Sequence, residues 1–227
     1  MLVSVSFGDA WAWGERVRAA GIVTATQIAS VDEARMAEDA GIQVLVARGS
    51  EGGGHGDPKV GTLPLLEAVL DAVSVPVLAA GGISSPRGLA AVLAAGASGA
   101  WMGTAFSACP ESLASDTVRD ALVGAKETET VTTSVFDISL GYGWPARFPE
   151  RVLHNPFSEH WSGREADLAL DPEARAALAD AITAGDRRAV HVDAGQGVGS
   201  LTEVRSVAEV MERLFAGAKE LLGTWAP

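Results

Sequence analysis

The sequence predicts an α/β fold in which five parallel strands alternate with helices, on the basis of three observations. A helix end, a glycine and an apolar run recur together in AAGIVTAT (19–26), DAGIQVLVA (39–47) and AAGASGAWMGTAF (94–106). The apolar runs hardly alternate with polar residues, as expected for parallel strands that are covered on both faces. The segments between them have helical spacing. Such units form either part of a (β/α)8 barrel or a doubly wound sheet.

The helices have recognisable start signals. Ser30 and Glu33 fit a capping box, and Ser85 precedes Pro86 at a favoured first helical position. Segment 11–20 reads as a helix although Gly14 weakens its helical propensity. The expected order is strand 2–7, helix 11–20, strand 22–28, helix 32–40, strand 42–47, glycine loop 49–56, helix 62–73, strand 75–80, helix 86–95 and strand 99–103.

The amino-acid composition and pattern of the chain change after about residue 124. Residues 127–161 are rich in aromatic residues and contain prolines, so residues 125–200 are expected to form an irregular covering segment. Helices are expected at 170–185 and 201–223, with a second glycine-rich turn at 191–200 between them. No linker composition marks a boundary, so the sequence predicts a single domain over 1–227.

The composition excludes several classes of function. A net charge of −12 without a lysine or arginine cluster argues against nucleic-acid binding. No apolar run reaches the roughly 18–20 residues that a membrane span needs, and the start lacks the features of a signal peptide. The single cysteine, Cys109, allows no internal disulfide and suits packing in a reducing cytosol. We therefore expect a cytoplasmic protein.

Three loops are expected to meet at one edge of the sheet, because right-handed crossovers place every loop after a strand at the same end. They are the glycine loop 49–56, AAGGI at 79–83 and MGTAF at 102–106. A single Gly-Gly pair is most simply a tight turn, but two adjacent loops of this kind favour a phosphate held by backbone N–H groups. The candidate residues for it are Gly81, Gly82, Gly103 and Thr104.

His55 is the candidate catalytic residue. It lies in the glycine loop, where an imidazole can accept or hold a proton near neutral pH beside backbone that a ligand can approach closely. Glu51 either orients His55 or caps the loop by accepting backbone N–H bonds. The other histidines show no metal-ligand spacing, so no metal site is expected; they are His154, His160 and His191.

Several long segments resemble the nitronate monooxygenase family, also called 2-nitropropane dioxygenase-like flavoproteins. They are residues 44–56 (VLVARGSEGGGHG), 62–106, 136–165 and 194–201 (AGQGVGSL). The resemblance implies a TIM barrel that binds FMN and needs no metal. It implies oxidation of alkyl nitronates or nitroalkanes by dioxygen to a carbonyl compound and nitrite. His55 matches the family's catalytic histidine, as a base or as an anchor for a nitronate. The implied FMN contacts are Gly53, Gly82, Trp101, Met102, Gly103 and Thr104, with the phosphate on the last two loops.

The chain departs from the family pattern in two places. Arg48 stands where the family usually has a glutamine that touches the flavin, which puts flavin affinity and potential in question. The family also begins with three further β-α units, so strands 2–7 and 99–103 are expected to have unpaired edges. Three explanations stay open: a fragment of a longer protein, a start placed too late, or a homo-oligomer in which a second copy covers the gap.

Two alternative functions also stay open. An FMN-dependent enoyl-acyl-carrier-protein reductase shares the barrel, the histidine loop and the AGQ turn, and it would consume NADH or NADPH. The other alternative is an inactive, truncated remnant that binds no flavin.

Overall fold

The computed structural model describes residues 1–8, 11–186 and 188–225. It contains the expected parallel sheet. Within these residues five strands pair in the order β1-β2-β3-β5-β6, and all four pairings are parallel. The strands are β1 (Leu2–Ser4), β2 (Val23–Ile28), β3 (Val44–Arg48), β5 (Val77–Ala80) and β6 (Gly99–Trp101). β1 and β6 form the two edges of this sheet, as the sequence predicts.

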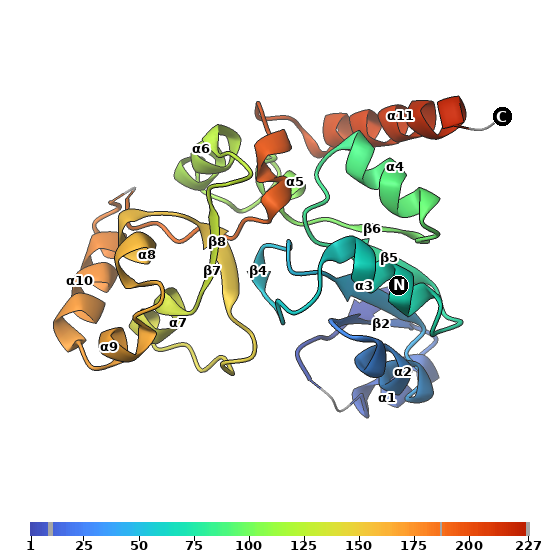
Figure 1. The fold of residues 1–227 in the computed structure, drawn as a ribbon, viewed down its shortest axis with the longest axis horizontal. Helices are drawn as coiled ribbons and strands as arrows, with labels where there is room; N and C mark the ends of the chain where they lie inside the picture. The colour runs from blue at the N-terminus through green and yellow to red at the C-terminus, as the bar shows by residue number, and fades with distance from the viewer. Residues whose placement is uncertain (9–10, 187, 226–227) are drawn as a thin grey trace.

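Four helices connect these strands, at or near the predicted positions (Figure 1). They are α1 (Trp13–Ala19), α2 (Val31–Asp39), α3 (Thr62–Leu70) and α4 (Pro86–Ala94). The predicted N-caps are present, because the hydroxyl of Ser30 accepts a hydrogen bond from the backbone N–H of Glu33, and that of Ser85 from Gly88. The recurring glycines Gly21, Gly41 and Gly96 all have positive φ, which confirms their role as left-handed residues after helices.

The main core lies between this sheet and its helices. Ile28 and Leu45 on the strands pack with Leu66 and Val69 on α3, and all four are almost fully buried. Trp11 closes one end of the core, where its indole Nε1 donates to Thr26 Oγ1 at 3.2 Å. The strands whose apolar residues do not alternate with polar ones are therefore covered by helices, as their pattern indicates.

Residues 125–200 differ from the expected irregular segment. They contribute two strands to a second, antiparallel sheet in the order β4-β8-β7, beside the helices α7 to α10 (Figure 1). Its strands are β4 (Gly54–His55), β7 (Thr130–Thr133) and β8 (Glu150–Leu153). The helices are α7 (Val135–Leu140), α8 (Pro156–Trp161), α9 (Glu165–Ala169) and α10 (Pro172–Thr183). They bury a core of their own around Phe136, Leu168 and Leu178, which stabilises elements too short to show a sequence period.

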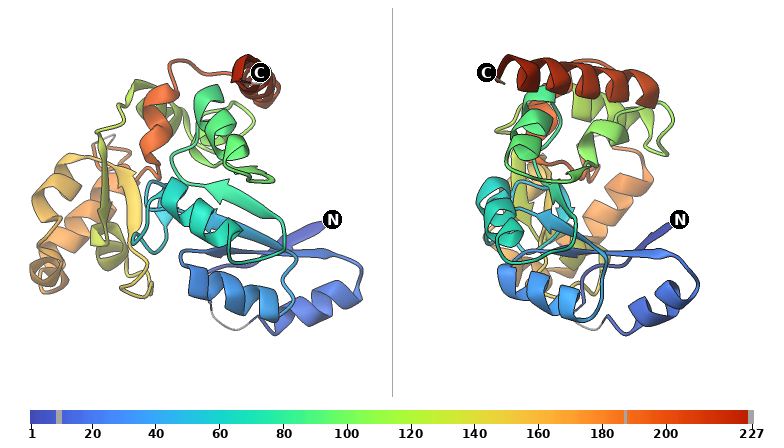
Figure 2. Two further views of the ribbon diagram at one scale, coloured as in Figure 1. Left: turned by 45° about the vertical axis from the view of Figure 1, so that its right-hand side comes forward. Right: turned by 90° about the vertical axis from the view of Figure 1, so that its right-hand side faces the viewer.

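The remaining helical elements come after β6 in the chain. They are α5 (Thr104–Ser107), α6 (Asp116–Gly124), the 3-10 helix η1 (Gln196–Ser200) and α11 (Val207–Trp225). Figure 2 shows α11 lying along α4, where Leu214 and Ala218 pack against Leu89 and Ala90. None of the helices within the described residues combines the length and the apolar content needed to cross a bilayer.

Candidate active site

The loops after β3, β5 and β6 enclose an open cleft of about 280 Å³. The cleft is lined by all eight residues that the sequence singled out for a cofactor, namely Arg48, Gly53, Gly81, Gly82, Trp101, Met102, Gly103 and Thr104. The AGQG turn at 194–197 completes one wall through Gly195. The structure therefore brings the predicted loops to one edge of the sheet, as the crossover rule requires.

The glycines allow these loops to pack backbone against backbone. A methyl group on Gly53 would lie 2.6 Å from the backbone nitrogen of Gly195, and one on Gly81 would lie 2.6 Å from Thr62 Oγ1. Gly81 and Gly82 also have positive φ, which disfavours any side chain there. Thr104 Oγ1 accepts a hydrogen bond from the Gly195 N–H at 3.0 Å. The loops are thus fastened to one another independently of any ligand.

Arg48 organises the glycine loop. Its Nη2 lies 2.9, 3.1 and 2.8 Å from the carbonyl oxygens of Gly52, Gly53 and Gly54. The side chain is only 8% exposed, and burial, followed by repulsion from Arg151, lowers the pKa of Arg48 to about 10. The guanidinium is still protonated at neutral pH. Arg48 therefore lines the cleft as a fixed positive charge whose Nη2 is bound by the glycine loop.

Glu51 caps a helix and does not orient His55. Its carboxylate accepts hydrogen bonds from the backbone N–H and the hydroxyl of Thr62, at 2.7 and 2.6 Å, at the start of α3. Of the two roles that the sequence left open, the structure supports the capping role. Arg151 on β8 fixes the other side of the same loop by donating from Nε to the carbonyl of Ser50 at 3.0 Å.

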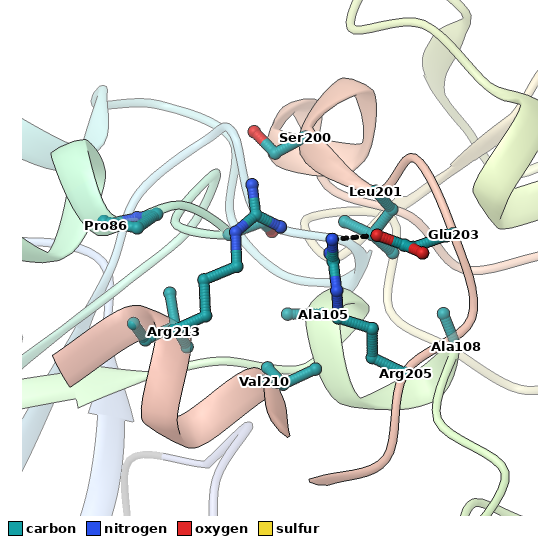
Figure 3. Close-up of a pocket in the computed structure, with 11 residues that line it drawn as sticks. Pro86, Ala105, Ala108, Ser200, Leu201, Glu203, Arg205, Val210 and Arg213 are labelled. Carbon is teal, nitrogen blue, oxygen red and sulfur yellow. Dashed lines mark hydrogen bonds and ion pairs between the residues drawn. The ribbon is translucent and has the colours of Figure 1, made fainter. Parts of the chain in front are cut away.

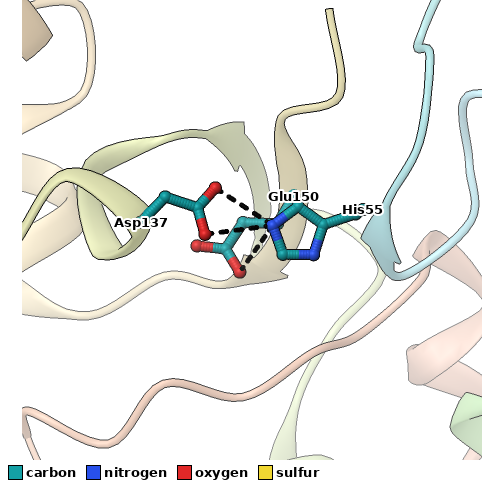
Figure 4. Close-up of side chains that lie close together, drawn as sticks. All are labelled: His55, Asp137 and Glu150. Carbon is teal, nitrogen blue, oxygen red and sulfur yellow. Dashed lines mark hydrogen bonds and ion pairs between the residues drawn. The ribbon is translucent and has the colours of Figure 1, made fainter. Parts of the chain in front are cut away.

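The imidazole of His55 lies beside the cleft and is not among the residues that line it. Its Nε2 is 3.0 and 3.1 Å from the two carboxylate oxygens of Asp137, as Figure 4 shows. The indole of Trp144 stacks on the imidazole at 3.8 Å between ring centroids and 12° between planes. Of the two residues of β4, only Gly54 lines the cleft. The imidazole is thus held in one orientation by α7 and by the loop before β8.

Glu150 lies behind His55 and was missed by the sequence analysis. Its side chain is fully buried, with Oε2 4.0 Å from His55 Nε2 and 2.7 Å from His191 Nε2. His191 is also 3.5 Å from Asp193, which lines the cleft. Burial lowers the pKa of His191, but the charges of the nearby carboxylates of Asp193 and Glu150 outweigh it and raise this pKa to about 10. His191 is therefore a cation at neutral pH.

A second hollow lies between α11 and the end of η1 (Figure 3). Its volume is about 30 Å³, and it is lined by Arg205 and Arg213, with Arg205 ion-paired to Glu203. A space of this size holds about one or two water molecules. It is too small for a flavin, whereas the cleft after β3, β5 and β6 is lined by the predicted loops and is the candidate active site.

Comparison with known proteins decides the family. The sequence profile described as nitronate monooxygenase matches residues 1–217. The chain belongs to the nitronate monooxygenase family. A probable nitronate monooxygenase of Staphylococcus aureus (strain Newman) is 38% identical over 191 residues, which cover 80% of this chain and 52% of that protein. The chain thus spans about half the length of the curated relatives that it matches.

Solved structures agree with the family fold. FabK from Thermotoga maritima is similar with a TM-score of 0.84 and 30% identity, covering 99% of this chain and 70% of that one. Nitroalkane oxidase from Streptomyces ansochromogenes gives a TM-score of 0.81 and 31% identity, covering 99% and 66%. The predicted barrel-type α/β fold is therefore confirmed, with five strands of its sheet present among the described residues.

Proposed function

We propose that this protein binds FMN in the cleft and oxidises alkyl nitronates or nitroalkanes with dioxygen, giving a carbonyl compound and nitrite. The observation that carries the proposal is the convergence of three glycine-bearing loops on one cleft beside a fixed histidine, in a member of the nitronate monooxygenase family. The family relatives support the flavin chemistry, and the cleft supplies the place for it.

The residues of the cleft fit a flavin phosphate. A methyl group on Gly103 would meet no atom within 4 Å, so a ligand has room against that backbone. The paired glycines Gly81 and Gly82 also line the cleft. The carboxylate of Asp193 would repel a phosphate, so we assign the phosphate to the side of Gly82 and Gly103. FMN, when bound, would supply the electron transfer to dioxygen.

His55 would hold or move the proton of the substrate. Asp137 accepts a hydrogen bond from Nε2–H and therefore favours the tautomer in which Nδ1 has a free lone pair. Nδ1 would then accept the proton from the carbon next to the nitro group. A substrate that is already a nitronate needs no base, and a protonated His55 would donate to its oxygens. Asp137 and Trp144 act through His55 as positioning residues.

The test compares a neutral nitroalkane with its preformed nitronate in His55→Gln. We expect kcat for the nitroalkane to fall at least about a hundredfold, because general bases contribute roughly that factor, whereas the nitronate should lose much less. Nitrite release and flavin absorbance are measured together, with exposed His160→Gln as the matched control. Undiminished turnover of the nitroalkane by His55→Gln would show that His55 is not the base.

A second candidate is reduction of an enoyl thioester, which the similarity to FabK from Thermotoga maritima supports. The same preparation can be given NADH or NADPH with an enoyl thioester, and oxidation of the nicotinamide can be followed. Nicotinamide oxidation without nitrite release from a nitronate would favour this candidate. Nitrite release that needs no nicotinamide favours the nitronate oxidation.

A further inference from the structure

Glu150 has a buried carboxylate whose two oxygens lack hydrogen-bond partners. Its side chain is fully buried, and among the described residues neither Oε1 nor Oε2 makes a hydrogen bond. His191 Nε2 approaches Oε2 at 2.7 Å, yet this contact lacks hydrogen-bond geometry and His191 Nε2 is itself without a hydrogen-bond partner. A buried charged group normally has partners because desolvation is costly, so this carboxylate calls for a further ligand such as an ion.

The atoms around Glu150 are arranged as a metal ion requires. His55 Nε2 is 3.0 Å from Asp137 Oδ2 and 4.0 Å from Glu150 Oε2, and the three ligand atoms lie within 4.8 Å of one another. Zn²⁺ binds imidazole nitrogen and carboxylate oxygen at about 2.0–2.2 Å, which places the ligand atoms of a tetrahedral site roughly 3.3–3.6 Å apart. The two distances from His55 Nε2, 3.0 and 4.0 Å, lie on either side of that range. Figure 4 shows the three side chains pointing toward one another.

The charges of the cluster also favour a cation. Asp137 and Glu150 are both buried carboxylates, and Asp193 adds a third on the cleft side. His191 Nε2 contacts the same Glu150 oxygen, Oε2, that lies 4.0 Å from His55 Nε2. A divalent ion between His55, Asp137 and Glu150 would place positive charge beside two buried carboxyl groups, where water is largely excluded.

We propose that His55 Nε2, Asp137 and Glu150 form a site for one Zn²⁺ ion. The mixed nitrogen and oxygen ligand set selects an imidazole-binding transition metal over Mg²⁺ or Ca²⁺. Binding at Nε2 removes the hydrogen bond between His55 and Asp137. With Zn²⁺ on Nε2, the neutral imidazole carries its proton on Nδ1. If the proposed function is correct, Nδ1 can then no longer accept the substrate proton, and Zn²⁺ inhibits turnover of a neutral nitroalkane.

The first experiment uses the unaltered protein and needs no activity. The chain has four histidines, so the imidazole nitrogens of ¹⁵N-labelled protein can be resolved by NMR during titration with ZnCl₂. We expect a new His55 Nε2 resonance that saturates at one Zn²⁺ per chain, with MgCl₂ producing no change. Shifts confined to the exposed His154 and His160, or no shift at all, would overturn the proposal.

The second experiment measures Zn²⁺ affinity by calorimetry in Asp137→Asn, which keeps the shape of the side chain. We expect the dissociation constant to rise by at least about 10–100-fold, the range found when even an indirect partner of a metal is removed. His160→Gln should bind as the unaltered protein does. Circular dichroism verifies that each variant is folded. A folded Asp137→Asn with unchanged Zn²⁺ affinity contradicts the site, whatever the result of the nitrite assay.

Discussion

Asp137 on α7 and His55 on β4 are 82 positions apart in the chain, yet both carboxylate oxygens lie within 3.1 Å of the imidazole Nε2. β4 has only two residues and owes its place to pairing with β8, in which His55 lies opposite Glu150. The second sheet therefore aligns the glycine loop with the acidic residues of the segment that follows the parallel sheet. The position of the candidate base depends on this pairing.

Replacing Asp137 with asparagine should lower kcat for a neutral nitroalkane. An asparagine amide can still bond to Nε2, but it no longer selects the Nε2–H tautomer. We expect a fall of at least about tenfold in kcat with little change in KM, because Asp137 positions His55 and lies away from the cleft lining. Imidazole ¹⁵N shifts report the tautomer directly. An unaltered tautomer population together with full activity would rule out this positioning role.

Replacing Gly53 with alanine should weaken both the fold and FMN binding. The added methyl group would lie 2.6 Å from the backbone nitrogen of Gly195, and backbone cannot move away as a flexible side chain can. The expected loss in free energy of unfolding is about 1–3 kcal/mol, typical of overpacking. Gly143→Ala is the matched control, since a methyl group there meets nothing within 4 Å. Urea denaturation should therefore separate the two variants, and equal stabilities would refute the close packing.

Replacing Arg48 with methionine should disorder the glycine loop. Three carbonyl oxygens would lose their shared donor, and we expect the free energy of unfolding to fall by about 1–3 kcal/mol. Arg35→Met, on the exposed face of α2, is the control and should change stability by less than about 0.5 kcal/mol. Protease cleavage within residues 49–56 gives an independent readout. If the protease cleaves this loop no faster in Arg48→Met than in the unaltered protein, Arg48 does not order the loop.

His191 should make stability depend on pH on the alkaline side. The pKa of His191 is raised to about 10 in the folded protein, against about 6.5 for an unperturbed histidine, so folding favours the protonated imidazole. This contribution is complete below about pH 6.5, and it is lost as the pH rises through about 10. Urea denaturation between these values should show falling stability that His191→Gln flattens. Exposed His154→Gln serves as the control. A variant His191→Gln with the same pH dependence as the unaltered protein would exclude this linkage.

The parallel sheet could be predicted from the sequence because its signals are local. Gly21, Gly41 and Gly96 each end a helix, and the apolar runs that follow form β2, β3 and β6 or the turns into them. The cleft could be predicted for the same reason, since parallel strands place their following loops at one edge. The function of Arg48 could not be predicted this way. Its guanidinium donates to backbone carbonyl oxygens. Every residue has such an oxygen, so the sequence does not show which ones Arg48 contacts.

The acidic surroundings of His55 could not be predicted either. Asp137 and Glu150 lie in a segment whose short strands and helices show no clear period, so the sequence analysis treated 125–200 as irregular. Their approach to His55 depends on an antiparallel pairing between β4 and β8, and no turn residues in the sequence predict this pairing. Cross-sheet contacts of this kind arise from tertiary packing, which overrides local propensity.

The central claim is that the glycine loops hold FMN by its phosphate, and the most direct measurement is a titration of the protein with FMN followed by flavin fluorescence. Riboflavin, which lacks the phosphate, is the matched ligand. We expect saturable quenching by FMN at one site per chain and at least tenfold weaker binding of riboflavin. Equal binding of the two flavins, or binding of neither, would contradict this claim.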